Sequence, residues 1–183
     1  MPLYKVYHSY PITDEQRQAL ATSITNLHCE TFTTPSFFVH IRFIPHDASD
    51  GNYFMAGRPR LINSNYIVGI VRTSPARSKS TFDALAAKIE TAWYEAVHSQ
   101  PFKGLDNDEH DTERKRLRMV TFTPMITIRE GGMAIPEAGT EGTWLKEQLP
   151  FIKQMSEREG LDDFTEMLRE IEEREDLKRL VSE

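Results

Sequence analysis

Two successive strand–helix–strand patterns constrain the fold of this chain more than any other feature of its sequence. In the first, residues 3–8 mix aromatic and β-branched side chains, as a strand does. Thr13 and Gln16 then form a capping-box signature that predicts the start of a helix. That helix has an apolar stripe at helical spacing, formed by Leu20, Ile24, Leu27 and Thr31. Pro35 ends it, and a second strand is predicted at residues 37–44.

The second unit repeats this pattern with little sequence identity to the first. Residues 66–71 are almost continuously apolar, which is typical of a strand buried on both faces. Ser80 and Thr81 open a helix whose stripe contains Phe82, Leu85, Ile89, Ala92, Trp93 and Ala96. A charged connection at residues 99–118 leads to a strand at 119–128. Two right-handed βαβ units related by a pseudo-dyad predict an α+β fold, with one mixed four-stranded sheet and both helices on one face.

The opposite face of this predicted sheet has no covering layer. The strands carry apolar side chains on both faces, and a twisted sheet must bury both against something. The remaining chain is too polar to cover the second face alone. We therefore expect the protein to oligomerise through its sheet.

A third segment follows the two units. Residues 130–139 are rich in glycine and proline and predict a loop or a short hairpin. From Thr143 a helical pattern returns, breaks at Pro150 and Gly160, and resumes. The resumed helix has apolar residues at Leu161, Phe164, Leu168 and Ile171, which predict docking by a narrow stripe. Residues 157–183 hold 11 of the 28 acidic residues and 5 of the 22 basic ones. This excess of acidic side chains indicates a helix face exposed to solvent.

Composition excludes several classes of protein. The chain has 183 residues, of which 39% are hydrophobic and 27% charged, so it predicts one globular domain rather than a disordered chain. No apolar run approaches the roughly 20 residues that span a bilayer, and the start lacks a signal-peptide core, so we expect a cytoplasmic protein that does not insert into a membrane. Cys29 cannot form an internal disulfide alone. Without a basic excess, nucleic acid is not an expected partner.

Three residues are candidates for binding and transforming a small carboxylate. Pro2 follows Met1, whose removal is expected before a small residue, and a free amino-terminal proline is a secondary amine that burial and nearby cations can tune. Arg72 closes the apolar strand and Arg77 lies in the turn before the second helix. Paired guanidiniums offer bidentate hydrogen bonds to a carboxylate. The same residues also fit purely structural roles: Pro2 as the first residue of a strand, and Arg72 and Arg77 as surface residues of a turn.

Two more residues are candidates on weaker grounds. His28 flanks the buried stripe near the end of the first helix, where the helix dipole favours its cationic form, although a packed core histidine fits the same position. Glu130 precedes two glycines, a setting that can aim a carboxylate into a cleft or simply place an acid in a loop. The run His28-Cys29-Glu30 predicts no metal site, because consecutive helical residues point in different directions.

Four stretches of the sequence together resemble a known family. They are the start Pro2-Leu3-Tyr4, the helix segment 24–28, the pair formed by Arg72 and Ala76-Arg77-Ser78, and Glu130 followed by Pro136, Gly139, Glu141-Gly142 and Trp144. This set resembles the tautomerase superfamily, in particular the group around cis-3-chloroacrylic acid dehalogenase, over most of residues 2–145. We therefore expect a tautomerase-like domain at residues 1–145 and an acidic helical C-terminal extension at 146–183.

The resemblance also implies an assembly and a role for each candidate. It implies a homotrimer of double βαβ subunits, with the proline at the floor of a pocket built partly by neighbouring subunits. Pro2 is then the catalytic amine, and Arg72 and Arg77 are the carboxylate clamp. His28 is a substrate-orienting donor, and Glu130 positions or activates water.

Three functional hypotheses follow. We favour a cofactor-independent tautomerase of small unsaturated 2-oxo or 2-hydroxy carboxylic acids, with neutral Pro2 as general base. The second is a hydratase or dehalogenase of acrylate-type acids, with cationic Pro2 as acid and Glu130 activating water; residues 121–123 disfavour it, because the dehalogenases have a tyrosine in the last strand. The third is a catalytically silent relative that binds a protein through its acidic tail. Retention of Met1 favours the third, since the Pro2 nitrogen is then a tertiary amide without basicity.

Overall fold

A mixed four-stranded sheet lies at the centre of the computed structural model, which describes residues 1–99 and 109–182. The strand order is β2-β1-β5-β6, with β1 at Leu3–His8, β2 at His40–Pro45, β5 at Asn65–Val71 and β6 at Leu117–Pro124. β1 is parallel to β2 and antiparallel to β5, and β5 is parallel to β6. All four predicted strands are present, although β2 begins after residue 37 and β6 ends before residue 128.

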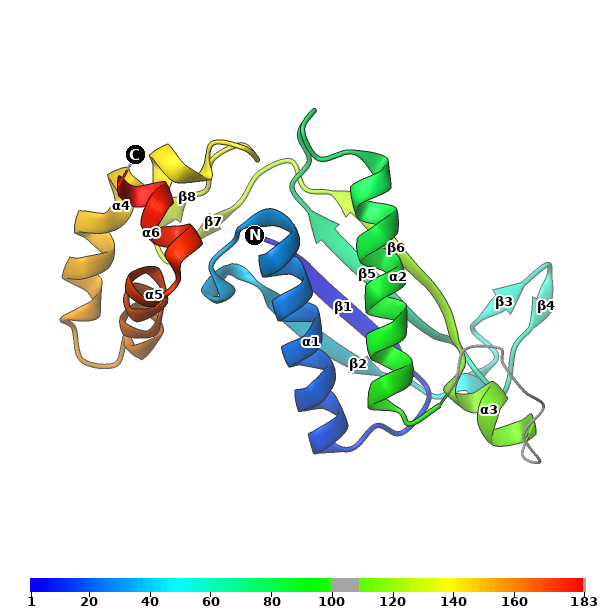
Figure 1. Ribbon diagram of the computed structural model, residues 1–183. Coiled ribbons are helices and arrows are strands. Elements are labelled where there is room, and N and C mark those ends of the chain that lie inside the picture. Colours follow the sequence, from blue (N-terminus) through cyan, green and yellow to red (C-terminus); the bar gives the residue numbers. More distant parts are fainter. Residues whose placement is uncertain (100–108, 183) are drawn as a thin grey trace.

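Two long helices lie side by side on one face of this sheet (Figure 1). The first, α1 at Asp14–Phe32, begins with the predicted capping box, in which the side chains of Thr13 and Gln16 each accept a backbone N–H of the other residue. The second, α2 at Lys79–Ala96, is capped by the Ser78 hydroxyl, which accepts from the backbone of Thr81. The predicted fold class, a double βαβ unit with both helices on one face, is thus confirmed.

The main core lies between the sheet and these two helices. Its fully buried members include Tyr4, Val6, Ile67, Leu20, Ile24, Leu85, Ile89 and Trp93. Gly69 in β5 is required for this packing, because a Cβ there would lie 2.7 Å from the ring of Phe122 and 3.0 Å from that of Tyr4. The absence of a side chain lets these two rings meet edge to face over the middle of the sheet.

Short elements connect the parts of the fold. They are η1 at Ser36–Phe38, η2 at Ala48–Asp50, β3 at Phe54–Met55, β4 at Arg58–Pro59, α3 at Glu109–Lys115, β7 at Arg129–Glu130 and β8 at Met133–Ala134. β3 pairs with β4 and β7 with β8, each as an antiparallel two-stranded ribbon. In the charged connection predicted at residues 99–118, α3 and the start of β6 occupy the second half, and residues 100–108 lie outside the described part of the chain.

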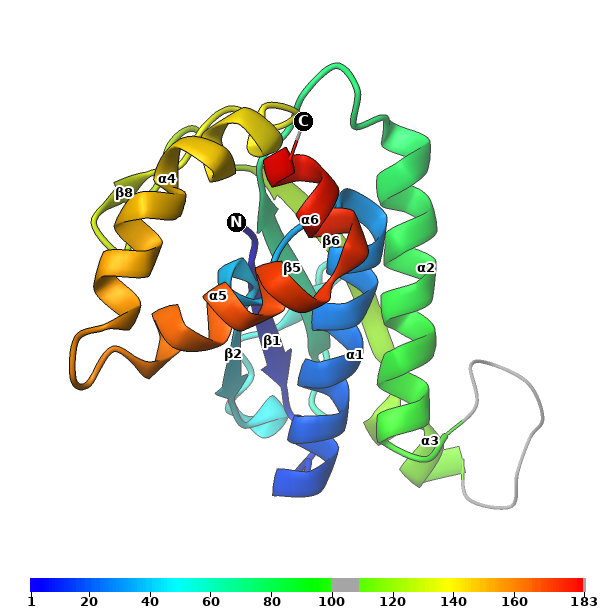
Figure 2. The same cartoon turned by 60° about the vertical axis from the view of Figure 1, so that its left-hand side comes forward.

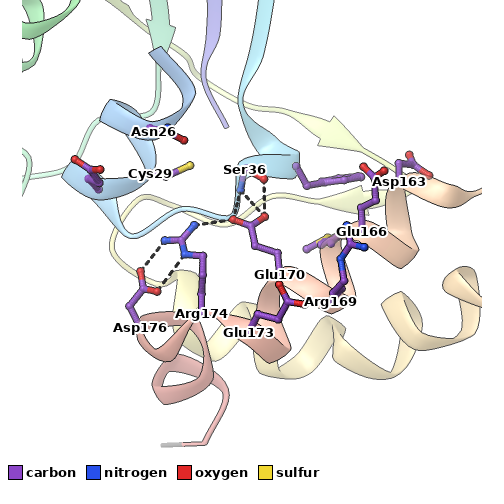
Figure 3. Close-up of a pocket in the computed structure, with 13 residues that line it drawn as sticks. Asn26, Cys29, Ser36, Asp163, Glu166, Arg169, Glu170, Glu173, Arg174 and Asp176 are labelled. Atoms are coloured by element: carbon purple, nitrogen blue, oxygen red, sulfur yellow. Dashed lines mark hydrogen bonds and ion pairs between the residues drawn. The ribbon is translucent and has the colours of Figure 1, made fainter. Parts of the chain in front are cut away.

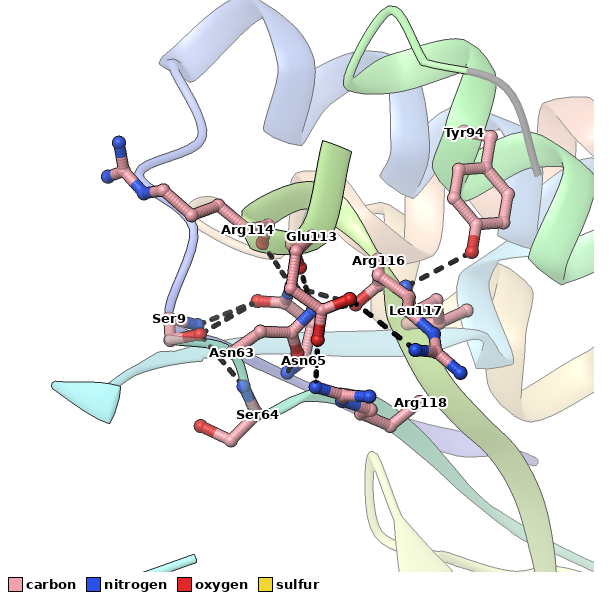
Figure 4. A network of polar contacts seen from close by, with 10 residues as sticks. All are labelled: Ser9, Asn63, Ser64, Asn65, Tyr94, Glu113, Arg114, Arg116, Leu117 and Arg118. Carbon is pink, nitrogen blue, oxygen red and sulfur yellow. Dashed lines mark hydrogen bonds and ion pairs between the residues drawn. The ribbon is translucent and has the colours of Figure 1, made fainter. Parts of the chain in front are cut away.

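A buried polar network fixes the entry into β5 and β6 (Figure 4). Asn65 accepts backbone N–H groups of Ser9 and Tyr10 through Oδ1 and donates to the carbonyls of Arg114 and Arg116 through Nδ2. Asn63, also fully buried, donates to the carbonyls of Glu113 and Arg116. These amides satisfy backbone groups that no strand partner reaches, so they anchor the end of α3 beside the first turn of the fold.

Three helices at the carboxyl end form a second core, at the end of the sheet where β1 begins (Figure 2). They are α4 at Glu141–Ser156, α5 at Asp162–Glu173 and α6 at Glu175–Ser182. The buried members of this core are Met1, Phe38, Met133, Leu145, Ile152, Met155, Phe164, Met167, Ile171 and Leu177. The contact is therefore broader than the narrow stripe predicted from the sequence, and it includes the first residue of the chain.

The predicted break at Pro150 is wrong, because α4 continues through that residue. A proline inside a helix removes one backbone hydrogen bond and costs about 3 kcal/mol. Leu145 and Ile152, on either side of it, are buried in the second core, and their burial offsets this cost. The predicted break at Gly160 is correct, since Gly160 has a φ of 80° between α4 and α5. Residue 145, the predicted end of the first domain, lies inside α4.

Glu170 of α5 and Arg174, which lies between α5 and α6, hold this unit against the segment after α1 (Figure 3). The Glu170 carboxylate accepts from the backbone N–H of Ser36 at 2.8 Å and from its hydroxyl at 2.6 Å. Arg174 donates to the carbonyl of Thr34 at 3.1 Å and to Glu170 at 2.7 Å. Charge-assisted hydrogen bonds are stronger than neutral ones, so α5 and α6 are fixed in position beside the start of the sheet.

Burial in the second core generates a stability prediction. Met167 is 1% exposed, so Met167→Ala should lower the free energy of unfolding by about 2–5 kcal/mol, because it removes buried methylene groups and leaves a cavity. Met55 in β3 is 38% exposed, and Met55→Ala is the matched control, expected to change stability by less than about 1 kcal/mol. Urea denaturation followed by circular dichroism measures both. Equal losses would show that the C-terminal core adds no particular stability.

Candidate active site

The antiparallel pairing of β1 with β5 brings the amino terminus to the arginines. Leu3 lies opposite Ile70, so the residues before Leu3 lie beside the residues that follow Ile70. Met1 is 3% exposed and Pro2 is buried. The carbonyl of Pro2 accepts the backbone N–H of His40 at the start of β2. The amino terminus therefore lies at the end of the sheet, where the central strand β1 begins between its parallel neighbour β2 and its antiparallel neighbour β5.

Arg72 and Arg77 meet at this edge, as the sequence predicts. Arg72 directly follows β5, and Arg77 lies in the turn before α2. Each side chain is only 9% exposed. Arg72 Nη1 donates to the carbonyl of Pro136 at 2.6 Å, and the Arg77 guanidinium lies over the ring of Phe32, 4.5 Å from its centroid. Both guanidiniums are thus fixed in direction before any ligand arrives.

Glu141, to which the sequence analysis assigns no role, is the partner of both arginines. Its Oε1 accepts from Arg72 Nη2 at 3.0 Å and from Arg77 Nη2 at 2.5 Å. Its Oε2 accepts the backbone N–H of Gly139 at 2.6 Å. The sequence signals for it are its place in the set of residues that carries the family resemblance and its position between a glycine-rich loop and a helical pattern, and neither says what it faces.

His28 lies in α1 and is buried, with 1% of its surface exposed. Its Nδ1 is 2.9 Å from the Tyr4 hydroxyl. Burial, as the largest cause, and the positive charges of the amino terminus, Arg77 and Arg72 together lower the pKa of His28 from 6.5 to about 3, so the ring is neutral at pH 7. The helix dipole favours a cationic ring at this position, but burial outweighs the dipole. With Nδ1 accepting from Tyr4, the Nε2–H is left as a donor.

Glu130 lies in β7 and pairs with His40, whose Nε2 is 2.7 Å from Oε1. The Glu130 side chain is 16% exposed. Burial raises the pKa of Glu130, and the hydrogen bond from His40 opposes that rise. His40 lies within the strand predicted at residues 37–44, and it is a second residue to which the sequence analysis assigns no role. The pair can hold or accept a proton.

The charged side chains of this site shift the pKa of the Met1 amine. Burial, as the largest cause, and the charges of Arg72 and Arg77 lower the pKa of the Met1 amine from 8.0 to about 5, against the opposing effect of Glu130 and Glu141. An amine at this place is therefore neutral at pH 7 and able to accept a proton. The structure thus brings all five predicted residues into one electrostatic neighbourhood.

The space around this group is nearly filled while Met1 is present. A cavity of about 20 Å³ remains beside Met1, lined also by Arg72, Pro136, Glu141 and Trp144. A larger groove of about 730 Å³ lies between α1 and the helices α5 and α6, and it contains none of the predicted site residues (Figure 3). Within residues 1–99 and 109–182 there is no cluster of three side chains suited to a metal ion and no helix able to cross a membrane.

Comparisons with known proteins agree with this fold. The model of the family described as "Putative oxalocrotonate tautomerase enzyme" matches residues 1–148. The structure of N1, a member of the cis-3-chloroacrylic acid dehalogenase family, superposes with a TM-score of 0.60 at 24% identity, covering 83% of this chain and 95% of that one. No curated protein sequence matches the chain.

Two further structures share the same architecture. MIF2 of Leishmania major has a TM-score of 0.52 at 15% identity, covering 74% of this chain and 97% of its own. The structure described as R7 fused 4-OT, a wild-type asymmetric trimer, has a TM-score of 0.50 at 18% identity, covering 72% of this chain and 94% of that one. At these identities the likeness establishes the shared fold.

The buried neutral His28 generates a prediction for stability against pH. Its pKa is about 3 in the folded chain and about 6.5 in the unfolded chain, so below pH 6.5 the unfolded chain binds a proton that the folded chain does not. Stability should therefore fall as the pH decreases from 6.5, by up to about 1.4 kcal/mol per pH unit from this group. His28→Gln removes this contribution, so its free energy of unfolding should fall less between pH 6.5 and 5 than that of the parent protein.

Urea denaturation at pH 7, 6 and 5 measures this slope. The same substitution at the exposed His98 is the control, and it should leave the slope of the parent protein in place. Identical slopes for the parent and His28→Gln would show that His28 is not held neutral by the fold.

Proposed function

This chain belongs to the tautomerase family whose model matches residues 1–148, and on that basis we propose that it is a cofactor-independent tautomerase of small unsaturated 2-oxo or 2-hydroxy carboxylic acids. The observation that carries the proposal is the buried amino terminus beside Arg72 and Arg77, where an amine has a pKa of about 5. Such an amine is neutral at pH 7 and can act as a general base, while the guanidiniums attract a carboxylate.

The proposal requires removal of Met1. In the chain that retains Met1, the Pro2 nitrogen is a tertiary amide and cannot accept a proton. Loss of Met1 would transfer the amine to Pro2 and vacate the space that the methionine side chain occupies against Arg72, Pro136 and Trp144. One cleavage would therefore create both the base and a pocket for substrate, and intact mass spectrometry of the purified protein detects it directly.

The reaction is a proton transfer without net oxidation. The proline nitrogen would take the proton from the hydroxyl of a bound enol and leave an enolate. It would then return that proton to the carbon of the former C=C bond, as the electron pair on the enolate oxygen forms the carbonyl. Arg72 and Arg77 would hold the substrate carboxylate and stabilise the negative charge that develops on the enolate. The Nε2–H of His28 would donate to the substrate oxygen, because its neutral ring keeps that proton.

A second candidate is hydration or dehalogenation of an acrylate-type acid, and the Glu130–His40 pair favours it. A carboxylate 2.7 Å from an imidazole can take a proton from water. This reaction also needs cationic Pro2 as the acid, whereas burial and both arginines act against a positive charge at the amino terminus. The balance of charges therefore supports the tautomerase over the hydratase.

We also propose that the active form is a homotrimer. The face of the sheet opposite α1 and α2 carries the half-buried Tyr7 and Tyr66, stacked at 4.5 Å between ring centroids, and Met119, which is 45% exposed. No helix among the described residues covers this face (Figure 1). A similar fold, R7 fused 4-OT, is described as a trimer, and an equivalent assembly here would cover this apolar surface.

The proposed function predicts how activity depends on the clamp and on pH. With an arylpyruvate enol, kcat/KM should rise with pH as the amine loses its proton and reach a plateau near neutral pH. Arg77→Ala should lower kcat/KM at least tenfold, about 1.4 kcal/mol of transition-state stabilisation, and move the rise to higher pH because a nearby positive charge is lost. Pro2→Ala should lower kcat more than KM.

Arg169→Ala, an exposed arginine on α5, is the matched control and should keep the parent profile. The measurement is the pH–rate profile of each variant with one substrate. Equal rates in all four proteins would refute the proposed site, whereas activity lost in Glu130→Gln with a hydrated product would support the second candidate.

The assembly predicts a molar mass three times that of the 21.1 kDa chain. Light scattering after size-exclusion chromatography at micromolar concentration measures it. Tyr66→Lys should reduce the mass, because it places a charge on the apolar face without altering the helix-facing core. A monomer at every concentration would contradict the proposal.

A further inference from the structure

The carboxylate clamp already contains a carboxylate from the chain itself. Glu141 Oε1 bonds to Nη2 of both Arg72 and Arg77. Among the described residues no other acidic side chain pairs with either arginine. The three side chains are 9%, 9% and 18% exposed, so water screens their charges only weakly. This contact occupies the place that a two-arginine site offers to a ligand.

Glu141 is held in this position from both sides. Its second oxygen accepts the N–H of Gly139, so the carboxylate cannot turn away without losing a hydrogen bond. It is the first residue of α4, where the helix dipole favours a negative charge. Leu180 of α6 packs onto the neighbouring Gly142, where a Cβ would lie 3.3 Å from Leu180 Cδ2. The C-terminal helices therefore keep the carboxylate in the clamp.

The clamp is nevertheless not saturated. Arg72 Nε is buried and has no hydrogen-bond partner. It belongs to a side chain that borders the space occupied by Met1, together with Glu141 and Trp144. A buried guanidinium N–H without an acceptor is costly, so this N–H favours a ligand that brings an oxygen to it.

We propose that Glu141 is the positioning and specificity residue of this site: it stays in the clamp, holds the two guanidiniums side by side, and restricts the ligand to one with a single carboxylate. Two arginines and Glu141 leave one net positive charge, which one carboxylate neutralises. A second carboxylate would lie in a poorly screened site beside Glu141 and Glu130, and like charges there repel. The substrate class is then a monocarboxylic 2-oxo or 2-hydroxy acid. This inference rests on the proposed function for the clamp role of the arginines.

The test compares two ligands of nearly equal size, crotonate and fumarate, in which a methyl group is replaced by a second carboxylate. Calorimetric titration at pH 7 uses protein whose mass shows that Met1 is absent. The parent protein should bind crotonate at least tenfold more tightly than fumarate. Glu141→Gln keeps the length of the side chain and removes its charge, so it should reduce this ratio to less than threefold. Glu147→Gln, the same change at an exposed position of α4, should retain the parent ratio.

A second readout separates a role in the site from a purely structural one. Glu141 acts on the amino-terminal amine by raising its pKa, against the lowering by burial, Arg72 and Arg77, with Glu130 acting in the same direction as Glu141. In Glu141→Gln the amine should therefore titrate at lower pH, as measured by nitrogen-15 NMR of the amino terminus. Glu141→Asp, which keeps the charge, should restore the ligand selectivity.

The outcomes distinguish this inference from the proposed function. Equal affinities for crotonate and fumarate in the parent protein, or no binding of crotonate, would overturn it even if the Glu141 variants failed to fold. An unchanged ratio in folded Glu141→Gln would also overturn it. Because binding needs no turnover, a protein that selects crotonate but tautomerises no 2-oxo acid would refute the proposed function and leave the role of Glu141 standing.

Discussion

The antiparallel pairing of β1 with β5 is the interaction on which the site depends. It places Leu3 opposite Ile70, so the buried amino terminus and Arg72 meet at the same sheet edge. A shift of one residue would turn Tyr4 and Val6 away from the core, and burial of these side chains therefore sets the register. Gly69 permits it, because only a residue without a Cβ leaves room for the rings of Tyr4 and Phe122.

Buried charge links this edge to the rest of the chain. Two guanidiniums at 9% exposure need an acceptor, since an uncompensated buried charge costs several kcal/mol. Glu141 supplies it from the start of α4, and the second core holds α4 in place. The C-terminal helices thus stabilise the clamp although they lie outside the double βαβ unit. Burial, together with the two guanidinium charges, keeps His28 and the amine neutral, so one arrangement determines both the structure and the protonation of the site.

Much of the fold follows from local patterns. The capping box at Thr13 and Gln16 and the glycine at residue 160 are signals that act over a few residues, and each is found where the sequence predicts it. The prediction at Pro150 fails because a helix can carry a proline when packing on both sides offsets the lost hydrogen bond, and that packing comes from residues far away in sequence.

The sequence alone determined the double βαβ fold and the identity of the five candidate residues, because residue type and spacing carry that information. Only the tertiary structure decided what each candidate faces. It showed that His28 is neutral, since burial outweighs the helix dipole, and that Glu130 pairs with His40. It also placed Glu141 between Arg72 and Arg77, 64 to 69 positions away in the chain. Protonation and pairing depend on burial and on charges within a few ångströms, and contacts across such separations leave no local pattern to read.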